Sequence, residues 1–422
     1  MMSIDLNFLQ QIGYVFSAML FIYGLKMLGK EDTAVKGNVI SALGMLLALL
    51  VTFGNILNPI LIFSAILIGG VIGSIFAIRV KMTSIPEMVA LFNGFGGLSS
   101  FFLAWSEFNT YSSVGVILFI TYLTVFIGGV TFSGSLIAYF KLSEIFKGSS
   151  KTLNTISRWL LIVFLGYLAI AMLQVISFSF GFFVFDFEII KIVFLGLLVI
   201  SLLSGLAFVL PIGGGDMPVV ISLLNSLSGI AAAMAGILLS NTALIVAGCL
   251  VGASGLILTL IMAKSMNRTL FNIFFVGFSD AGVSGGEVEG EVKPISAEDT
   301  FLILEAASSI LVVPGYGMAV AQAQHVVKEL GDLLEDNNAE ISYGIHPVAG
   351  RMPGHMNVLL AEANVSYDNL FEPKDLNPRM ETVDVVLVIG ANDVVNPSAT
   401  EQPGSPIYGM PIIEVHKDRK ST

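Results

Sequence analysis

Two loops in the C-terminal third of the chain combine glycines with a preceding apolar run. Gly315 to Val320 reads Gly-Tyr-Gly-Met-Ala-Val, and Gly390 to Pro397 reads Gly-Ala-Asn-Asp-Val-Val-Asn-Pro. Glycines at such a turn let the backbone approach a pyrophosphate at the start of a helix. The third position of the usual fingerprint is Val320, so the first loop alone fits a tight strand-to-helix turn equally well. The two loops together favour a dinucleotide site.

The polar residues between these loops narrow the choice of cofactor. The run from Gly344 to Pro347 ends a predicted strand without an acid that could hold a ribose 2′-hydroxyl, which counts against NAD and allows NADP. His346 and His355 have no third ligand nearby, so we interpret them as hydrogen-bonded loop or helix-start residues and predict no metal site. The single cysteine, Cys249, lies within an apolar span and adds no metal ligand.

These loops need a framework of strands and helices, and the periodicity after residue 300 indicates one. Apolar runs of strand length alternate with stretches of helical spacing. Parallel strands joined by helices form a doubly wound sheet, which binds ligands at the carboxyl ends of its strands. We therefore predict a Rossmann-like α/β domain with strands at 309–313, 341–345, 383–389 and 412–415 and helices at 318–334 and 353–363.

The rest of the chain is far more apolar than a globular protein. Of its 422 residues, 55% are hydrophobic and 12% are charged, and the mean hydropathy is +0.87. A membrane-spanning helix needs about 20 predominantly apolar residues. Nine stretches meet this requirement, which predicts a polytopic α-helical membrane domain with spans near 6–28, 37–55, 58–79, 85–106, 111–139, 156–178, 187–210, 216–239 and 241–263.

Basic residues in the short connections predict the orientation, because basic loops stay in the cytoplasm. The N-terminus is expected outside and the C-terminal domain in the cytoplasm. No basic region precedes the first span, so no cleavable signal peptide is expected. One side of the spans holds only Lys191, whereas the other holds Lys26, Lys30, Lys36, Arg79, Lys81, Lys141, Lys147, Lys151, Arg158, Lys264 and Arg268.

The charge balance changes after the last span. Residues 1–279 hold 9 acidic and 12 basic residues, a balance of +3, whereas residues 280–422 hold 22 acidic and 8 basic residues, a balance of −14. An acidic domain disfavours nucleic acid as a partner. Residues 279–300 are rich in Gly, Ser, Glu and Val without an apolar period, which is typical of a linker. We predict a membrane domain at 1–268, a linker at 269–300 and a nucleotide-binding domain at 301–422.

Two polar residues of the eighth predicted span suggest a function within the membrane. Asp216 follows three glycines at the start of the span, and Asn225 lies nine residues further along. An ionisable or amide group at membrane depth is costly, so its presence favours a functional role. Asp216 alone also fits a helix N-cap, and a stripe of small residues on the same span fits helix packing: Ser222, Ser226, Gly229, Ala233 and Gly236.

Three segments closely resemble the beta subunit of the proton-translocating nicotinamide nucleotide transhydrogenase. They are Gly315 to Gln324, Gly344 to Ala363 and Val386 to Pro397, and the second is a very specific run of twenty residues. The resemblance continues through Ser405 to Pro411. It also reaches the membrane part at Gly213 to Ser228, and it covers nearly the whole chain.

The resemblance implies an oxidoreductase that passes a hydride between NAD(H) on a partner alpha subunit and NADP(H) on this C-terminal domain, coupled to proton translocation. It also implies a bacterial inner membrane location and a dimer of alpha–beta units. Arg351 would lie near the phosphates, and Asp393 would lie near the nicotinamide as the catalytic group. The implied cofactor-binding residues are Gly315, Tyr316, Gly317, Met318, Ala319, Val320, Val348, Ala349, Gly350, Arg351, Met352, Pro353, Gly354, Gly390, Ala391, Asn392, Asp393, Val394, Val395, Asn396, Gly409 and Met410.

The residues implied for the proton path are Asn93, Asp216 and Asn225. Many family members have a histidine where Asn93 stands, and asparagine cannot titrate near neutral pH. All four histidines of this chain lie after residue 300. We therefore expect either that a group on a partner subunit titrates or that waters around Asn93 carry the proton.

The family pattern continues beyond the position of Thr422 with about two more strands and a Lys-Arg-Ser loop that holds the 2′-phosphate. By this resemblance, the sheet of this chain is expected to be truncated at its C-terminal end. The run Arg419-Lys420-Ser421 follows the last predicted strand too closely to be that loop. An alternative class is a membrane transporter with a cytoplasmic nucleotide-sensing domain, but such transporters often show internal repeats that this sequence lacks. A structural anchor would not need two glycine-containing loops.

Overall fold

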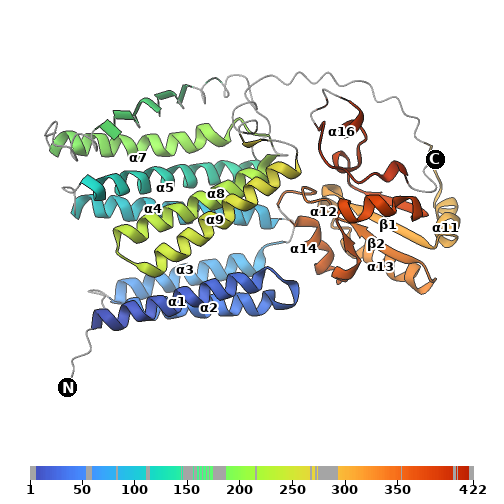
Figure 1. The fold of residues 1–422 in the computed structure, drawn as a ribbon, viewed down its shortest axis with the longest axis horizontal. Coiled ribbons are helices and arrows are strands. Elements are labelled where there is room, and N and C mark those ends of the chain that lie inside the picture. Colours follow the sequence, from blue (N-terminus) through green and yellow to red (C-terminus); the bar gives the residue numbers. More distant parts are fainter. Residues whose placement is uncertain are drawn as a thin grey trace. The chain divides into compact units, whose positions relative to one another are not determined.

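The chain forms two compact units (Figure 1). The computed structural model describes residues 6–53, 59–81, 84–110, 115–143, 187–213, 216–266 and 293–417, without 353, 403, 404 and 406, and isolated positions near 145–173 and 270. The first unit is Met1–Val80, Glu87–Pro211 and Val220–Leu258, and the second is Lys81–Pro86, Ile212–Val219 and Thr259–Thr422.

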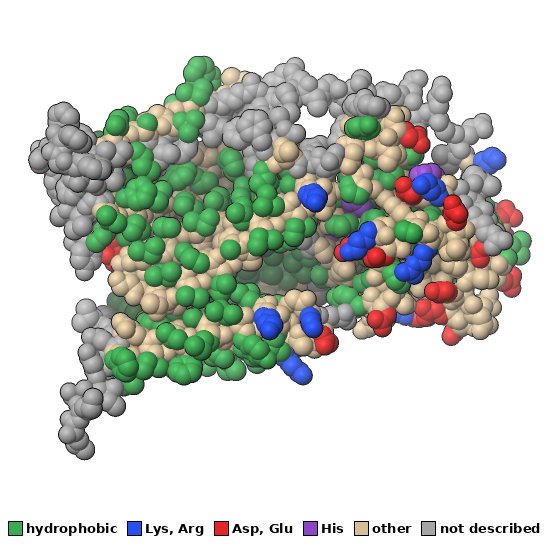
Figure 2. Space-filling model, in the orientation of Figure 1, with side chains coloured by type: hydrophobic (Ala, Val, Ile, Leu, Met, Phe, Trp, Pro, Cys, Tyr) green, Lys and Arg blue, Asp and Glu red, His purple; other side chains and the backbone are tan. Residues whose placement is uncertain are grey.

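Within the described residues, eight helices are long and apolar enough to cross a membrane. This finding confirms the predicted polytopic helical domain, and hydrophobic side chains cover these helices in Figure 2. The second helix begins six residues before its predicted start, and the sixth predicted span, 156–178, lies largely outside the described residues. The helices are α1 (Leu6–Leu28), α2 (Glu31–Phe53), α3 (Pro59–Arg79), α4 (Ile85–Thr110), α5 (Gly115–Leu142), α7 (Phe187–Val209), α8 (Met217–Leu238) and α9 (Thr242–Ser265).

Small residues let these helices pack closely, as is usual in membranes. The Ser226 hydroxyl on α8 donates to the Gly252 carbonyl of α9 at 2.6 Å, and the Ser222 hydroxyl donates to the Gly255 carbonyl at 3.2 Å. A Cβ added at Gly229 would meet the backbone of α9. The stripe of small residues on α8 is therefore a packing surface against α9.

The second unit contains a parallel four-stranded sheet with strand order β3-β2-β1-β4. The strands are β1 (Ser309–Pro314), β2 (Glu340–Gly344), β3 (Leu370–Phe371) and β4 (Val385–Ile389). Val312 of β1 pairs with Tyr343 on one side and Leu387 on the other. β1 is almost entirely buried, as expected for a central strand covered on both faces.

The connecting helices and the sheet form the predicted parallel α/β fold. The longer helices are α11 (Ala297–Glu305), α12 (Tyr316–Ala321), α13 (Gln324–Asp336) and α14 (His355–Glu362); α15 (Pro373–Leu376) and α16 (Ser398–Glu401) are short. The single helix predicted over 318–334 is wrong, because Gln322 adopts a left-handed conformation with φ 52° and ends α12. α11 begins inside the predicted linker range, where the Ser296 side chain caps its first turn.

The strand predicted at 412–415 does not form, and the short strand β3 takes the fourth place in the sheet. The Asn377 side chain explains this difference. Its amide nitrogen donates to the Ile412 carbonyl at 2.9 Å, and its carbonyl oxygen accepts from the Glu414 N–H at 3.1 Å. One side chain thus satisfies backbone groups that a neighbouring strand would otherwise pair.

Candidate functional site

The two predicted glycine loops lie side by side at the carboxyl ends of β1 and β4. The Gly315 N–H donates to the Ile389 carbonyl, and the Gly317 N–H donates to the Gly390 carbonyl, both at 2.9 Å. A Cβ added at Gly317 would lie 2.8 Å from the Gly390 Cα, and Gly390 has φ 65°. The glycines are therefore required by the close approach of the two turns, which supports the tight-turn interpretation.

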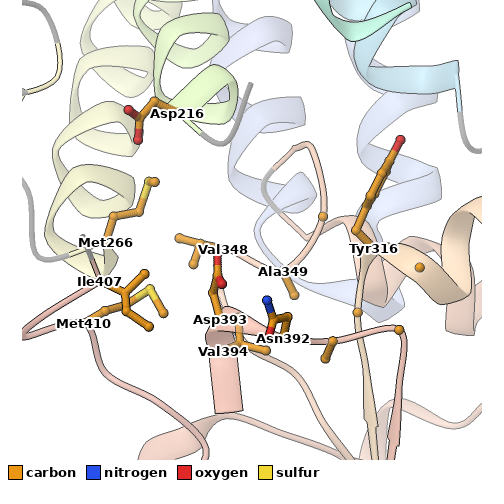
Figure 3. A pocket seen from close by; sticks show the side chains of 15 residues that line it. Asp216, Met266, Tyr316, Val348, Ala349, Asn392, Asp393, Val394, Ile407 and Met410 are labelled. Atoms are coloured by element: carbon orange, nitrogen blue, oxygen red, sulfur yellow. The ribbon is translucent and has the colours of Figure 1, made fainter. Parts of the chain in front are cut away.

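A cavity of about 440 Å³ opens beside these turns, within the range typical of small-molecule sites (Figure 3). It lies at the sheet edge where doubly wound proteins bind ligands. Asp216 and Met266, from short segments of the same unit, complete its lining. The other lining residues are Gly315, Tyr316, Gly317, Val348, Ala349, Gly350, Gly390, Ala391, Asn392, Asp393, Val394, Ile407 and Met410.

A cationic side chain lies beside this cavity. The Arg351 guanidinium carbon is 4.3 Å from the centre of the Tyr316 ring, which is a cation–π contact. The Arg351 N–H donates to His355 Nδ1 at 3.1 Å. Gly350 has φ 99°, and a Cβ there would collide with the His355 ring. The 350–351 turn is thus fixed between His355 and Tyr316, and it holds a basic group beside the cavity.

His355 is fully buried as the first residue of α14. Because Nδ1 accepts the Arg351 N–H, the neutral ring carries its proton on Nε2, and Nε2 is a buried atom with no hydrogen-bond partner among the described residues. Burial, with the nearby Arg351 charge as a second cause, lowers the pKa of His355 from 6.5 to about 4. This ring is a neutral hydrogen-bonding group, as its helix-start interpretation predicted.

The His355 pKa predicts a loss of stability in acid. The folded protein binds fewer protons than the unfolded chain between pH 4 and 6.5, so this contribution is complete above about pH 6.5 and is lost as the pH falls towards 4. His355→Asn keeps an acceptor near Nδ1 but cannot titrate. Its melting temperature should depend less on pH over this window than that of the unmodified protein, as measured by calorimetry in detergent. His325→Asn, at an exposed position on α13, is the matched control for the replacement of a histidine by asparagine.

His346 ties the loop after β2 to the segment 407–413. Its Nε2 lies 2.6 Å from the Pro411 carbonyl, and its Nδ1 accepts from the Val348 N–H at 3.3 Å. The ring is therefore the neutral tautomer with the proton on Nε2, and burial lowers its pKa. Since Val348, Ile407 and Met410 all line the cavity, His346 holds two of its walls together.

Asp393 and Asn392 lie in the turn that follows β4, and Figure 3 shows them next to each other at the cavity. The turn is a short 3-10 helix, Asp393–Val395, in which the Val395 N–H donates to the Asn392 carbonyl at 3.1 Å. The Asn396 side chain accepts from the Ser398 N–H at 3.0 Å and ends the turn. Asp393 is exposed, so its carboxylate can reach a ligand.

The remaining predicted binding residues lie around this cavity without all lining it. Met318 and Ala319 are buried in the domain core, whereas Val320 is 61% exposed. Pro353 lies outside the described residues. Ile407 was not predicted, although the run from Ser405 to Pro411 carries part of the family resemblance. The predicted residues that do not line the cavity are Met318, Ala319, Val320, Arg351, Met352, Gly354, Val395, Asn396 and Gly409.

In the first unit, polar residues from α4 and α5 meet inside the helix bundle. A Cβ added at Gly94 would lie 3.1 Å from the Ser135 Cβ, so the two helices are close beside Asn93. The Asn93 amide nitrogen and the Ser135 hydroxyl are buried atoms without a hydrogen-bond partner among the described residues. Unpaired buried polar groups cost about 1–3 kcal/mol each, so this site suits water or a polar ligand.

α8 packs against α5 one residue before Ser135. A Cβ added at Gly134 would lie 3.1 Å from a Leu224 methyl carbon on α8. The next residue, Asn225, is half-buried. Asp216 lies just before α8 in the second unit, where its N–H donates to the Gly213 carbonyl at 3.2 Å. The structure therefore brings α5 against both Asn93 and the helix of Asn225.

These features define a class of protein: a multi-pass membrane protein that carries a parallel α/β domain with a dinucleotide-type site. The NAD(P) transhydrogenase beta subunit family matches residues 10–421 of the chain. The NAD(P) transhydrogenase subunit beta of Rhodospirillum rubrum is 44% identical over 440 residues, which cover 97% of this chain and 89% of the relative. The same values hold for a named strain of that organism, ATCC 11170. The chain belongs to the NAD(P) transhydrogenase beta subunit family, the proton-translocating subunit that binds NADP(H).

Proposed function

We propose that NADP(H) binds in the cavity beside the two glycine turns and exchanges a hydride with NAD(H) on the alpha subunit. The observation that carries this proposal is the pairing of the Gly315 and Gly390 turns around a cavity of about 440 Å³ at the carboxyl ends of parallel strands. The unpaired Nε2 of the buried His355 adds a donor nearby. The residues present therefore fit a dinucleotide.

The nicotinamide supplies the hydride chemistry when it is bound, and the protein positions it and excludes water. The Tyr316 ring and the Val348 and Met410 side chains form apolar walls. Asp393 is proposed to poise the nicotinamide. Arg351, held over Tyr316 at 4.3 Å, is proposed to bind a phosphate. No protein nucleophile is needed, because the hydride passes directly between two cofactors.

Arg351→Ala tests this assignment of the cavity. A charge-assisted contact to a phosphate contributes about 1.5–3 kcal/mol, so the dissociation constant for NADPH should rise at least about tenfold. NADPH fluorescence during titration of the purified protein measures it. Arg379→Ala is the matched control, because Arg379 also lies over an aromatic ring, at 5.2 Å from Phe371, outside the cavity. Equal affinity of the two variants for NADPH would show that Arg351 does not bind the cofactor.

Protons are proposed to cross the first unit near Asn93 and Asn225, and Asp216 at the start of α8 is proposed to belong to the same path. The unpaired Asn93 and Ser135 groups support a hydrated path, in which water rather than Asn93 itself carries the proton. Replacement of Asn225 with Leu should lower proton movement more than the cyclic hydride exchange that keeps NADP(H) bound. Ser222→Ala, which removes the hydrogen bond to the Gly255 carbonyl of α9, should lower both activities alike. Proton movement at the unmodified rate in Asn225→Leu would place the path elsewhere.

The assembly is proposed to be a dimer of alpha–beta units in the bacterial inner membrane. The distribution of Lys and Arg supports an external N-terminus and a cytoplasmic nucleotide-binding domain. Cysteine labelling of single-cysteine variants from either side of sealed vesicles tests this orientation. Labelling of a cysteine placed at Lys30, between α1 and α2, from the periplasmic side alone would contradict this orientation.

A further inference from the structure

The C-terminal end of α7 is held by a lysine from another helix. Lys141, in the last turn of α5, directs its Nζ to the backbone carbonyls of Val209 at 3.3 Å and Leu210 at 2.6 Å. Both carbonyls belong to the end of α7, where a helix leaves its last carbonyls without intrahelical donors. Such an end also carries a partial negative charge that a cation stabilises.

The sequence after α7 explains why the end of this helix needs the Lys141 contact. Pro211 follows directly and has no N–H to donate back to the helix, so the usual glycine cap cannot form at that position. Gly213 to Gly215 come next, and Asp216 and α8 begin immediately afterwards. Lys141 therefore holds the chain shortly before the start of α8.

The same region of α5 also contacts the helix that carries Asn225. A Cβ added at Gly134 would lie 3.1 Å from both a Val209 methyl carbon of α7 and a Leu224 methyl carbon of α8. α5, the end of α7 and the Leu224 turn of α8 thus share one contact point, two helical turns from Lys141. A shift of the α7 end would therefore change the packing around Leu224, the residue that precedes Asn225.

Lys141 would otherwise be a costly residue in an apolar helix. A lysine near a helix end usually extends into water along its flexible stem. Here the side chain is only half-exposed and turns to the neighbouring helix instead. We propose that Lys141 is a positioning residue of the transhydrogenase: it fixes the end of α7, just before α8 begins, and so keeps proton movement coupled to hydride transfer. This inference rests on the proposed proton path.

Lys141→Met tests the proposal, because methionine keeps the apolar stem and removes the donors. In the alpha–beta complex reconstituted in vesicles, proton movement per hydride transferred should fall about tenfold, whereas cyclic exchange with NADP(H) bound should change less than about twofold. Lys141→Arg keeps a charged donor and should restore at least about half of the coupling. Lys36→Met, at an exposed position on α2, is the matched control.

Hydrogen exchange of peptides from 203–213 gives a readout that does not depend on activity. Exchange at the end of α7 should increase in Lys141→Met and stay unchanged in Lys141→Arg and Lys36→Met. Unchanged exchange in Lys141→Met, or a loss of proton movement and cyclic exchange in equal proportion, would overturn the proposal. An unmodified complex that exchanges hydride without moving protons would instead refute the proposed function, and the inference with it.

Discussion

The purified chain alone should give no hydride transfer from NADH to an NADP analogue, and a transhydrogenase alpha subunit should restore it. Among the described residues, one cavity is built from paired glycine turns, and direct transfer requires two bound dinucleotides. Absorbance of the reduced NADP analogue measures the rate. The expected change is from background to full turnover, which is the largest effect predicted for this protein.

A control must show that the isolated chain is intact. NADPH binding to the same preparation, followed by fluorescence, should persist without the alpha subunit. Turnover by the chain alone, at a rate comparable with that of the complex, would refute the division of the two cofactors between subunits.

Asp393→Asn should lower hydride transfer at saturating cofactor at least about tenfold, equivalent to about 1.4 kcal/mol in the barrier. The carboxylate is exposed at the cavity in the turn after β4, and the substitution removes its charge while keeping its shape. The turn itself is held by backbone bonds of Val395 and Asn396, so the fold should survive. Stopped-flow absorbance measures the transfer step directly.

Asp368→Asn is the matched control, because Asp368 is an exposed aspartate of the same domain outside the cavity. It should leave the rate unchanged. Equal rates of hydride transfer in Asp393→Asn and the unmodified enzyme would show that Asp393 has no role in the reaction.

The sequence predicts the architecture because the signals that determine it are local or periodic. Apolar stretches long enough to span a membrane give the helices, and alternating strand and helix patterns give the parallel sheet. The glycine loops predict the cavity because carboxyl ends of neighbouring parallel strands meet at one edge. Their bonding partners, Ile389 for Gly315 and Gly390 for Gly317, follow from that adjacency.

The errors arise where one side chain overrides a pattern. The run at 412–415 has strand propensity, but Asn377 pairs its backbone and prevents a ladder. The helix predicted at 318–334 breaks at Gln322, a residue type with no intrinsic preference for positive φ. β3 has only two residues, which is too short for a periodic signal.

The sequence also does not predict contacts between residues that lie far apart in the chain. His346 bonds to Pro411 across 65 positions, and Lys141 bonds to Leu210 across 69. Each residue looks ordinary in its local sequence: a loop histidine and a lysine at a helix end. Only the fold brings them to their partners.

Proton movement during hydride transfer tests the central claim most directly. The chain and an alpha subunit should be reconstituted in vesicles that contain a pH-sensitive dye, and NADPH and an NAD analogue should be added. We predict a pH change across the membrane that follows the rate of hydride transfer and disappears with a protonophore. Hydride transfer at full rate without any pH change would contradict a proton-translocating role for the helical unit of this chain.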